Sequence, residues 1–225
     1  MLSIIPRKNR EMSHSLWTYY HQEKLNGAQI LDQTALFFDR TPEIKEHFEA
    51  SSNRRIVQFG AGVGTFISTL VTTKHVVGYD YTAPSLDSLT ASGILARNVD
   101  LNEATNTSEL VYQDRLTEDL TIPSDLLIIR TFEYITPAAG ILFLFSLIKE
   151  AKPGTSFYIE IANSSDADES EPLVSTGHVA LVRPRFIASF FAPRTDFKFI
   201  HHHLLPKTRE AGVEMDVEQL AVQKL

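Results

Sequence analysis

The fold is decided by Ile56-Val57-Gln58-Phe59-Gly60-Ala61-Gly62-Val63-Gly64-Thr65, followed by Val76-Val77-Gly78-Tyr79-Asp80. This order predicts a buried strand, a glycine-rich turn, a short helix and a second strand that ends on an acid. Glycines let the backbone approach a ligand closely, and the first N–H groups of a helix are free to bind it. A carboxylate at the end of the next strand can accept hydrogen bonds from a ribose diol. The two stretches therefore predict a nucleoside-binding turn.

The spacing of the glycines separates two kinds of nucleoside site. The dinucleotide fingerprint G-x-G-x-x-G requires Gly or Ala at its sixth place, where this chain has Thr65. The pattern G-x-G-x-G is typical of sites for S-adenosylmethionine (SAM), in which no pyrophosphate has to be bound. The stretch from Gly60 to Asp80 is close to what a turn, a helix and a strand require. A tight turn in an unrelated α/β protein is the alternative.

Composition limits the class of protein. The chain has 225 residues, of which 43% are hydrophobic and 22% charged, as in a one-domain globular α/β protein. The net charge is −7 and no dense basic patch is present, so nucleic acid is not expected as a partner. Because there is no cysteine, disulfides, thiolate metal sites and a cysteine nucleophile are excluded. No signal peptide or membrane-spanning run is apparent, which predicts a cytoplasmic protein without a membrane partner.

Strand and helix patterns alternate along most of the chain. Strands are expected at residues 54–60, 75–80, 94–101, 124–130 and 156–162, and helices at residues 64–73, 84–91, 136–151 and 184–191. Residues 197–205 and 214–224 alternate between polar and apolar and predict a long hairpin-like pair that closes the sheet. Such an order predicts a doubly wound, mostly parallel sheet with its ligand site at the carboxyl ends of the strands. The acidic segment 163–177 between the fifth strand and the last helix predicts a long loop.

Residues 1–53 precede this alternation and form a predicted N-terminal helical cap on the core domain, residues 54–225. Apolar residues recur at helical spacing between residues 12 and 50. Thr41-Pro42 is typical of an N-cap followed by the first residue of a second, short helix.

The chain resembles the class I SAM-dependent methyltransferases over roughly residues 54–225. Residues 57–64 are similar to the glycine-rich first motif of that family, and residues 77–80 to its second motif. Residues 124–135 are similar to the strand-four motif, and residues 148–155 to the L-K-P-G-G turn before strand five. The resemblance implies a Rossmann-like, seven-stranded sheet whose last strand is inserted antiparallel, and SAM as the cofactor.

The resemblance also implies a set of cofactor-binding residues: Gln58, Gly60, Ala61, Gly62, Asp80, Tyr81, Asp100, Leu101, Arg130 and Thr131. Asp80 is expected on the ribose hydroxyls, and Arg130 on the cofactor or a substrate carboxylate. Asp100 is the expected acid beside the adenine, and Asp114 is the alternative if strand three lies later. The family commonly has an acid where this chain has Gln58, which can accept a hydrogen bond but carries no charge.

Four residues are candidates for the catalytic chemistry. Tyr19 and His21 belong to an aromatic N-terminal cluster that can face a sulfonium by cation–π attraction, with core packing as the alternative. Glu133 follows strand four and can orient or deprotonate a substrate, or else cap the turn. His178 can act as a general base or lie on a surface loop. His201 and His203 share one face of a strand without a nearby acid, so no metal site is expected.

The sequence therefore predicts a SAM-dependent methyltransferase of small-molecule biosynthesis, acting on an O or N nucleophile as a monomer or homodimer. Two alternatives stay open. One is an enzyme that cyclises or cleaves SAM intramolecularly and releases methylthioadenosine. The other is a non-catalytic binding protein on the same fold, for which Gln58 is the support.

Overall fold

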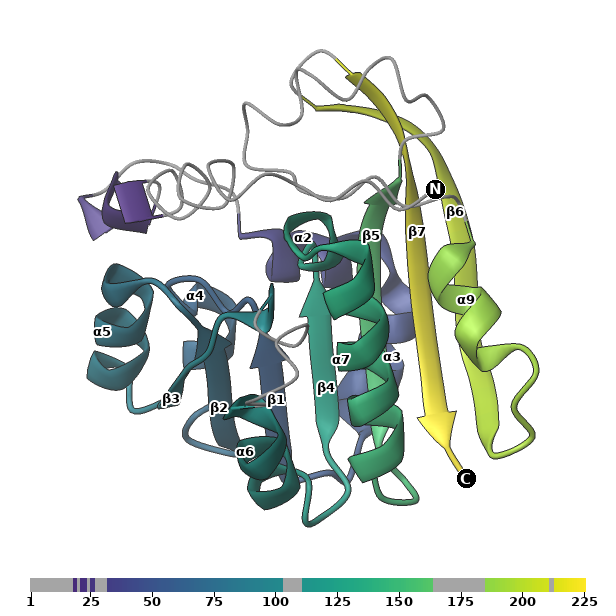
Figure 1. The fold of residues 1–225 in the computed structure, drawn as a ribbon, viewed down its shortest axis with the longest axis horizontal. Helices are drawn as coiled ribbons and strands as arrows, with labels where there is room; N and C mark the ends of the chain where they lie inside the picture. Colours follow the sequence, from purple (N-terminus) through teal and green to yellow (C-terminus); the bar gives the residue numbers. More distant parts are fainter. Residues whose placement is uncertain are drawn as a thin grey trace.

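A single sheet forms the centre of the computed structural model, which describes residues 18–19, 21–23, 25–26, 32–102, 111–163, 185–210 and 213–225. Within these residues the sheet has seven strands in the order β3-β2-β1-β4-β5-β7-β6 (Figure 1). β1 to β5 are mutually parallel, and β7 lies antiparallel between β5 and β6. The strands are β1 (Arg55–Phe59), β2 (His75–Asp80), β3 (Leu95–Asn98), β4 (Asp125–Ile129), β5 (Ser156–Asn163), β6 (Phe197–Glu210) and β7 (Val213–Lys224).

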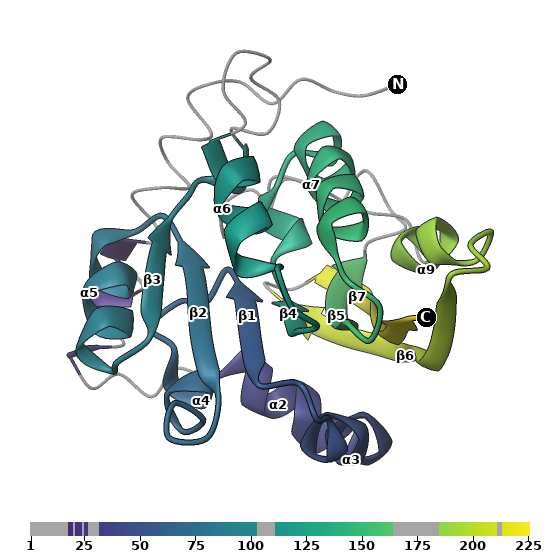
Figure 2. The same ribbon diagram turned by 90° about the horizontal axis from the view of Figure 1, so that it is seen from below.

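Helices cover both faces of the sheet, as Figure 2 shows. One face carries α2 (Gln33–Arg40), α3 (Pro42–Ala50), α4 (Thr65–Ser68) and α5 (Ala83–Ala91). The other face carries α6 (Val111–Asp119), α7 (Pro137–Glu150) and α9 (Phe186–Phe191). The predicted doubly wound α/β fold is therefore confirmed. Among the described helices, none is both long and apolar enough to cross a membrane.

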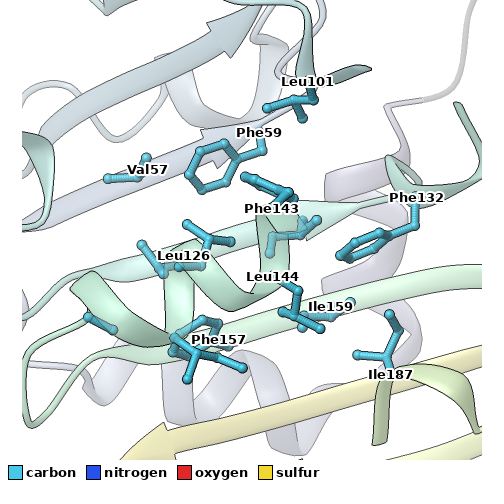
Figure 3. Close-up of a cluster of buried hydrophobic side chains, with 14 of the residues drawn as sticks. Val57, Phe59, Leu101, Leu126, Phe132, Phe143, Leu144, Phe157, Ile159 and Ile187 are labelled. Carbon is cyan, nitrogen blue, oxygen red and sulfur yellow. The ribbon is translucent and has the colours of Figure 1, made fainter. Parts of the chain in front are cut away.

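Two apolar cores lie on opposite sides of the sheet because successive side chains of a strand point to opposite faces. In β1, Ile56 packs with α2, α3 and α4, whereas Val57 packs with α6 and α7. All five residues of β4 are buried, as expected of a strand covered on both faces. Figure 3 shows the larger core, in which the rings of Phe59 and Phe143 meet edge to face with centroids 4.9 Å apart.

The helices α2 and α3 precede the first strand and share a core with the sheet. Phe37 and Phe38 of α2 are buried against the α3 side of the sheet, where Phe38 stacks on Phe66. α3 begins at Pro42 after the N-cap Thr41, as the sequence predicts. α2 and α3, which belong to the predicted cap, are thus integral to the domain core.

The element boundaries differ from the prediction at several places. β3 is shorter than the expected strand at residues 94–101, and β6 extends beyond the expected residues 197–205. The helix expected at residues 64–73 is α helical only over Thr65–Ser68 and continues as turns. α6 was not expected. Among its described side chains, Leu116 is in the core, together with Leu120 directly after the helix. This signal is too weak to stand out in the sequence, although it suffices once the sheet is in place.

Candidate functional site

The glycine-rich turn after β1 adopts left-handed backbone conformations, with φ of +65° at Gly60, +56° at Gly62 and +71° at Gly64. A Cβ built on Gly64 would lie 2.5 Å from Cδ2 of Leu89 in α5, so a side chain there has no room. The Ala61 amide donates to the Tyr79 carbonyl over 3.0 Å. The turn is therefore packed between the ends of β1 and β2 and the helix α5.

Asp80, at the end of β2, is 5% exposed and organises this turn through its carboxylate. Oδ2 accepts a hydrogen bond from the Gly62 amide over 2.9 Å. Oδ1 accepts from the amides of Tyr81 and Thr82 over 2.8 and 3.0 Å and from the Thr82 hydroxyl over 3.1 Å. A carboxylate oxygen accepts about two hydrogen bonds. Among the described residues, Oδ2 accepts one hydrogen bond, so it can accept a second one from a ligand.

The side chain of His21 lies against the same turn. Its Nδ1 atom lies 2.8 Å from the hydroxyl of Thr82 and 2.6 Å from that of Ser85. A Cβ built on Gly62 would lie 3.4 Å from its Nε2 atom, so the ring lies against the glycine turn. Tyr19, the other N-terminal candidate, is 65% exposed. The contacts with the glycine turn and with Thr82 are those of His21. His178, the fourth catalytic candidate, lies outside the described residues.

Gln58, two residues before the first glycine, is buried and bonded to α2. Its Nε2 donates to the Thr34 hydroxyl over 2.8 Å, and its Oε1 has no hydrogen-bond partner within the described part of the chain. Asp32 caps α2 through Oδ1 and accepts the Phe66 amide of α4 on Oδ2 over 2.9 Å. Asp32 was missed by sequence reasoning. Its place before a helical pattern signals an N-cap, but no sequence signal indicates the contact with α4.

In the segment after β4, Arg130 and Glu133 form a pair, although the sequence analysis assigned them different roles. Arg130 has a φ of +53°, unusual for a residue with a side chain. Its Nε donates to Oε1 of Glu133 over 2.5 Å. Glu133 is fully buried, and the same oxygen accepts the Ala162 amide of β5 over 2.7 Å. Glu133 therefore links Arg130 to β5 rather than capping its own turn.

Thr131 connects the same segment to the glycine turn. Its hydroxyl donates to the Phe59 carbonyl at the end of β1 over 2.9 Å. A Cβ built on Gly60 would lie 2.8 Å from that hydroxyl. The predicted residues Gly60 and Thr131 are therefore in direct contact.

The position of β3 shows which of the two candidates for the adenine-side acid follows strand three. β3 ends at Asn98, and Asp100 follows it, accepting the Asn102 amide on Oδ1 over 2.9 Å. Leu101 is buried in the larger core. Asp114 is exposed on the helix α6, so the interpretation with a later strand three is wrong. Asn102, which was not predicted, donates to the Tyr134 carbonyl over 3.1 Å and ties this segment to the turn after β4.

A second acid, Glu160 of β5, was also missed. It is fully buried, and its Oε2 accepts from Gln219 Nε2 over 2.7 Å. Burial raises the pKa of Glu160, and the charge of Glu133 adds to the rise. The hydrogen bond from Gln219 and the charges of Arg130 and Arg40 act in the opposite direction without cancelling it. An acid within a mostly apolar strand gives no sequence signal of its partners, which come from other strands.

Comparison with known proteins shows the fold. No protein-family model matches the chain, and no curated protein is similar to it in sequence. A SAM-dependent methyltransferase from Anabaena variabilis superposes with a TM-score of 0.61 at 16% identity, over 94% of this chain and 95% of the other.

Two further solved structures carry S-adenosylhomocysteine. The 1,6-didemethyltoxoflavin-N1-methyltransferase of Burkholderia thailandensis has a TM-score of 0.59 at 13% identity, over 99% of this chain and 91% of the other. The N-methyltransferase NodS of Bradyrhizobium japonicum has a TM-score of 0.55 at 12% identity, over 82% of this chain and 84% of the other. The chain therefore has the fold of the SAM-dependent methyltransferases.

Proposed function

We propose that the protein is a SAM-dependent methyltransferase that acts on a small molecule. The observation that carries the proposal is the hydrogen bond between the Gly62 amide and Asp80 Oδ2, which joins the glycine turn to the acid at the end of β2. Ligands of doubly wound sheets bind at this edge. The likeness in fold to methyltransferases supports the same conclusion.

The residues at this edge fit the parts of SAM. Asp80 Oδ2 can accept a ribose hydroxyl besides the Gly62 amide. Gln58 Oε1 is buried, has no partner among the described side chains and backbone groups, and is suited to accept a hydrogen bond from the ammonium of the cofactor. SAM supplies a methyl group that is already activated on a sulfonium. The protein has to orient the acceptor, exclude water and, for some acceptors, remove a proton.

A small O or N nucleophile is the acceptor class that the chain favours. The net charge of −7 does not suit a nucleic acid substrate. One structure of similar fold, from Burkholderia thailandensis, was solved with the small molecule 1,6-didemethyltoxoflavin bound. We infer a cytoplasmic enzyme, a monomer or homodimer, with residues 54–225 as the catalytic domain and residues 1–53 as its cap.

Calorimetric titration with SAM and S-adenosylhomocysteine tests the proposal. Both ligands should bind at one site per chain, and Asp80→Asn should weaken binding. Incubation with SAM and a panel of small amines, phenols and carboxylic acids should release S-adenosylhomocysteine with the correct acceptor. Absence of binding at millimolar ligand would overturn the proposal and leave a non-catalytic protein.

One observation favours a second candidate, in which SAM reacts with itself. Gln58 stands where an acid is common in the methyltransferases, and its Oε1 is free to accept a hydrogen bond. Incubation with SAM alone separates the two functions. Methylthioadenosine without an acceptor supports intramolecular cleavage, and unchanged SAM counts against it.

A further inference from the structure

A cluster of buried polar side chains lies beyond the glycine turn, at the carboxyl ends of β4 and β5. Glu160 of β5 is aligned with Ile129, the last residue of β4, and with Gln219 of β7. These positions lie on the sheet face that α2 covers, since Arg40 of α2 is 3.9 Å from Glu160 Oε1. Glu133, after β4, reaches the same place through its bond to the Ala162 amide.

Three oxygen atoms of this cluster have no hydrogen-bond partner among the residues that the structure describes. They are Oε2 of Glu133, Oε1 of Glu160 and Oε1 of Gln219. All three side chains are fully buried. Burial of a polar atom without a partner is unfavourable, and functional sites are where such groups are retained. Because each oxygen accepts hydrogen bonds when the acids are ionised, the missing partner is a donor.

The number of acceptors distinguishes between possible donors. An alkylammonium group has three N–H bonds and can serve three acceptors, whereas a hydroxyl group has one O–H bond. The neighbouring cations do not fill this role. Arg130 Nε bonds the other oxygen of Glu133, and Arg40 Nη1 lies beyond hydrogen-bond distance of Glu160.

We propose that Glu133, Glu160 and Gln219 bind the methyl acceptor, and that the acceptor is an aliphatic primary amine. This inference rests on the proposed methyltransferase function and names its substrate class. The cluster lies at the edge of the sheet where ligands of this fold bind, beside the segment that Thr131 ties to the glycine turn.

The chemistry balances with the residues present. The amine enters as an ammonium ion and gives one proton to the carboxylate of Glu160. Its nitrogen lone pair then forms a bond to the sulfonium methyl carbon, while the carbon–sulfur bond breaks and its electron pair stays on sulfur. Burial raises the pKa of Glu160, which makes it a stronger base than an exposed glutamate.

The test measures binding, independently of turnover. Butylamine, phenethylamine and their matched alcohols are titrated by calorimetry into the protein saturated with S-adenosylhomocysteine. We expect an amine to bind more tightly than its alcohol, and Glu160→Gln to weaken amine binding by about tenfold or more, as for loss of a hydrogen bond to a charged group. Equal affinity of amine and alcohol, or no binding of any amine, overturns the proposal.

Glu218→Gln is the matched control. Glu218 is also a buried glutamate with one unpartnered oxygen, but it bonds the Ala188 amide of α9, on the opposite face of the sheet. It should leave amine affinity unchanged. Equal effects of Glu160→Gln and Glu218→Gln would show a structural role and overturn the assignment. If Glu160→Gln does not fold, Gln219→Met removes a neighbouring acceptor, and unchanged amine affinity in that variant overturns the proposal.

The same titrations separate this inference from the function on which it rests. If S-adenosylhomocysteine does not bind the wild-type protein, the proposed function fails. If it binds but the amines are not preferred, only the acceptor assignment fails.

Discussion

The Gly62 amide donates a hydrogen bond of 2.9 Å to Asp80 Oδ2. The bond joins the turn after the first strand to the end of the second. A ligand at this edge therefore meets a turn whose shape is already fixed by the side chain that would bind it. Preorganisation of this kind reduces the entropy lost on binding.

Replacing Asp80 by Asn should weaken binding of S-adenosylhomocysteine by at least about tenfold and lower the free energy of unfolding by about 1–3 kcal/mol. Only one atom of an Asn amide accepts hydrogen bonds, whereas both Asp80 oxygens accept backbone amides. Calorimetry and urea denaturation measure the two effects. The control is Asp87→Asn, at an exposed position of α5. A folded Asp80→Asn protein with wild-type affinity would contradict the assignment.

Gly64→Ala should be more destabilising than Gly93→Ala, although both glycines have a positive φ. At Gly93 nothing lies within 4 Å of a built Cβ, so only backbone strain is added, about 1 kcal/mol. At Gly64 the new Cβ would also collide with Leu89, adding about 1–3 kcal/mol. Urea denaturation of both variants measures the difference. Equal losses would mean that Leu89 moves aside without strain.

Asp119→Ala should destabilise the protein by about 3–5 kcal/mol, because the Tyr79 hydroxyl and the Arg97 guanidinium would lose the carboxylate that accepts their hydrogen bonds. Asp119 accepts the Tyr79 hydroxyl over 2.6 Å and is bonded by Arg97 through Nε and Nη2. Tyr79→Phe removes one of these bonds and should have a smaller effect, about 1 kcal/mol. Thermal and urea denaturation compare the two. An effect of Tyr79→Phe as large as that of Asp119→Ala would contradict the ranking.

The stability of the protein should fall as the pH drops below about 6.5, in part because of His201. Burial lowers the pKa of His201, as do His202 and His203, and the nearby Glu43 opposes the shift. The unfolded chain therefore binds a proton at this position more readily than the folded chain, so acid favours unfolding. His201→Asn should flatten the dependence between pH 5 and pH 7, measured by urea denaturation at each pH. The exposed His75→Asn serves as the control. An unchanged slope in His201→Asn would contradict this role.

The parts of the fold that depend on neighbouring residues were predictable from the sequence. β2 spans His75–Asp80 as predicted, because its apolar run is bounded by a polar segment and an acid. The glycine turn and the order of strands follow from the same local patterns. α6 could not be predicted from local patterns. Its buried acid Asp119 is bonded by Arg97 of β3 and Tyr79 of β2, which are distant in the sequence.

Of the candidate site, the sequence predicted the glycine turn and the acid at the end of β2. Asp80 and Gly62 are close in sequence and belong to one motif. Glu160 and Gln219 come together only because β7 is inserted beside β5, which no local pattern encodes. Arg130 and Glu133 were both identified, but their pairing depends on the left-handed backbone at Arg130.

The insertion of β7 between β5 and β6 has a consequence for biosynthesis. β7 follows β5 in the sequence, so this interior strand leaves the ribosome later than the strand it pairs with. Until it arrives, β5 exposes an unpaired edge to other nascent chains, and such edges promote aggregation. A chain that lacks residues 213–225 should therefore aggregate, and a peptide spanning these residues, supplied in trans, should reduce that aggregation by pairing with β5.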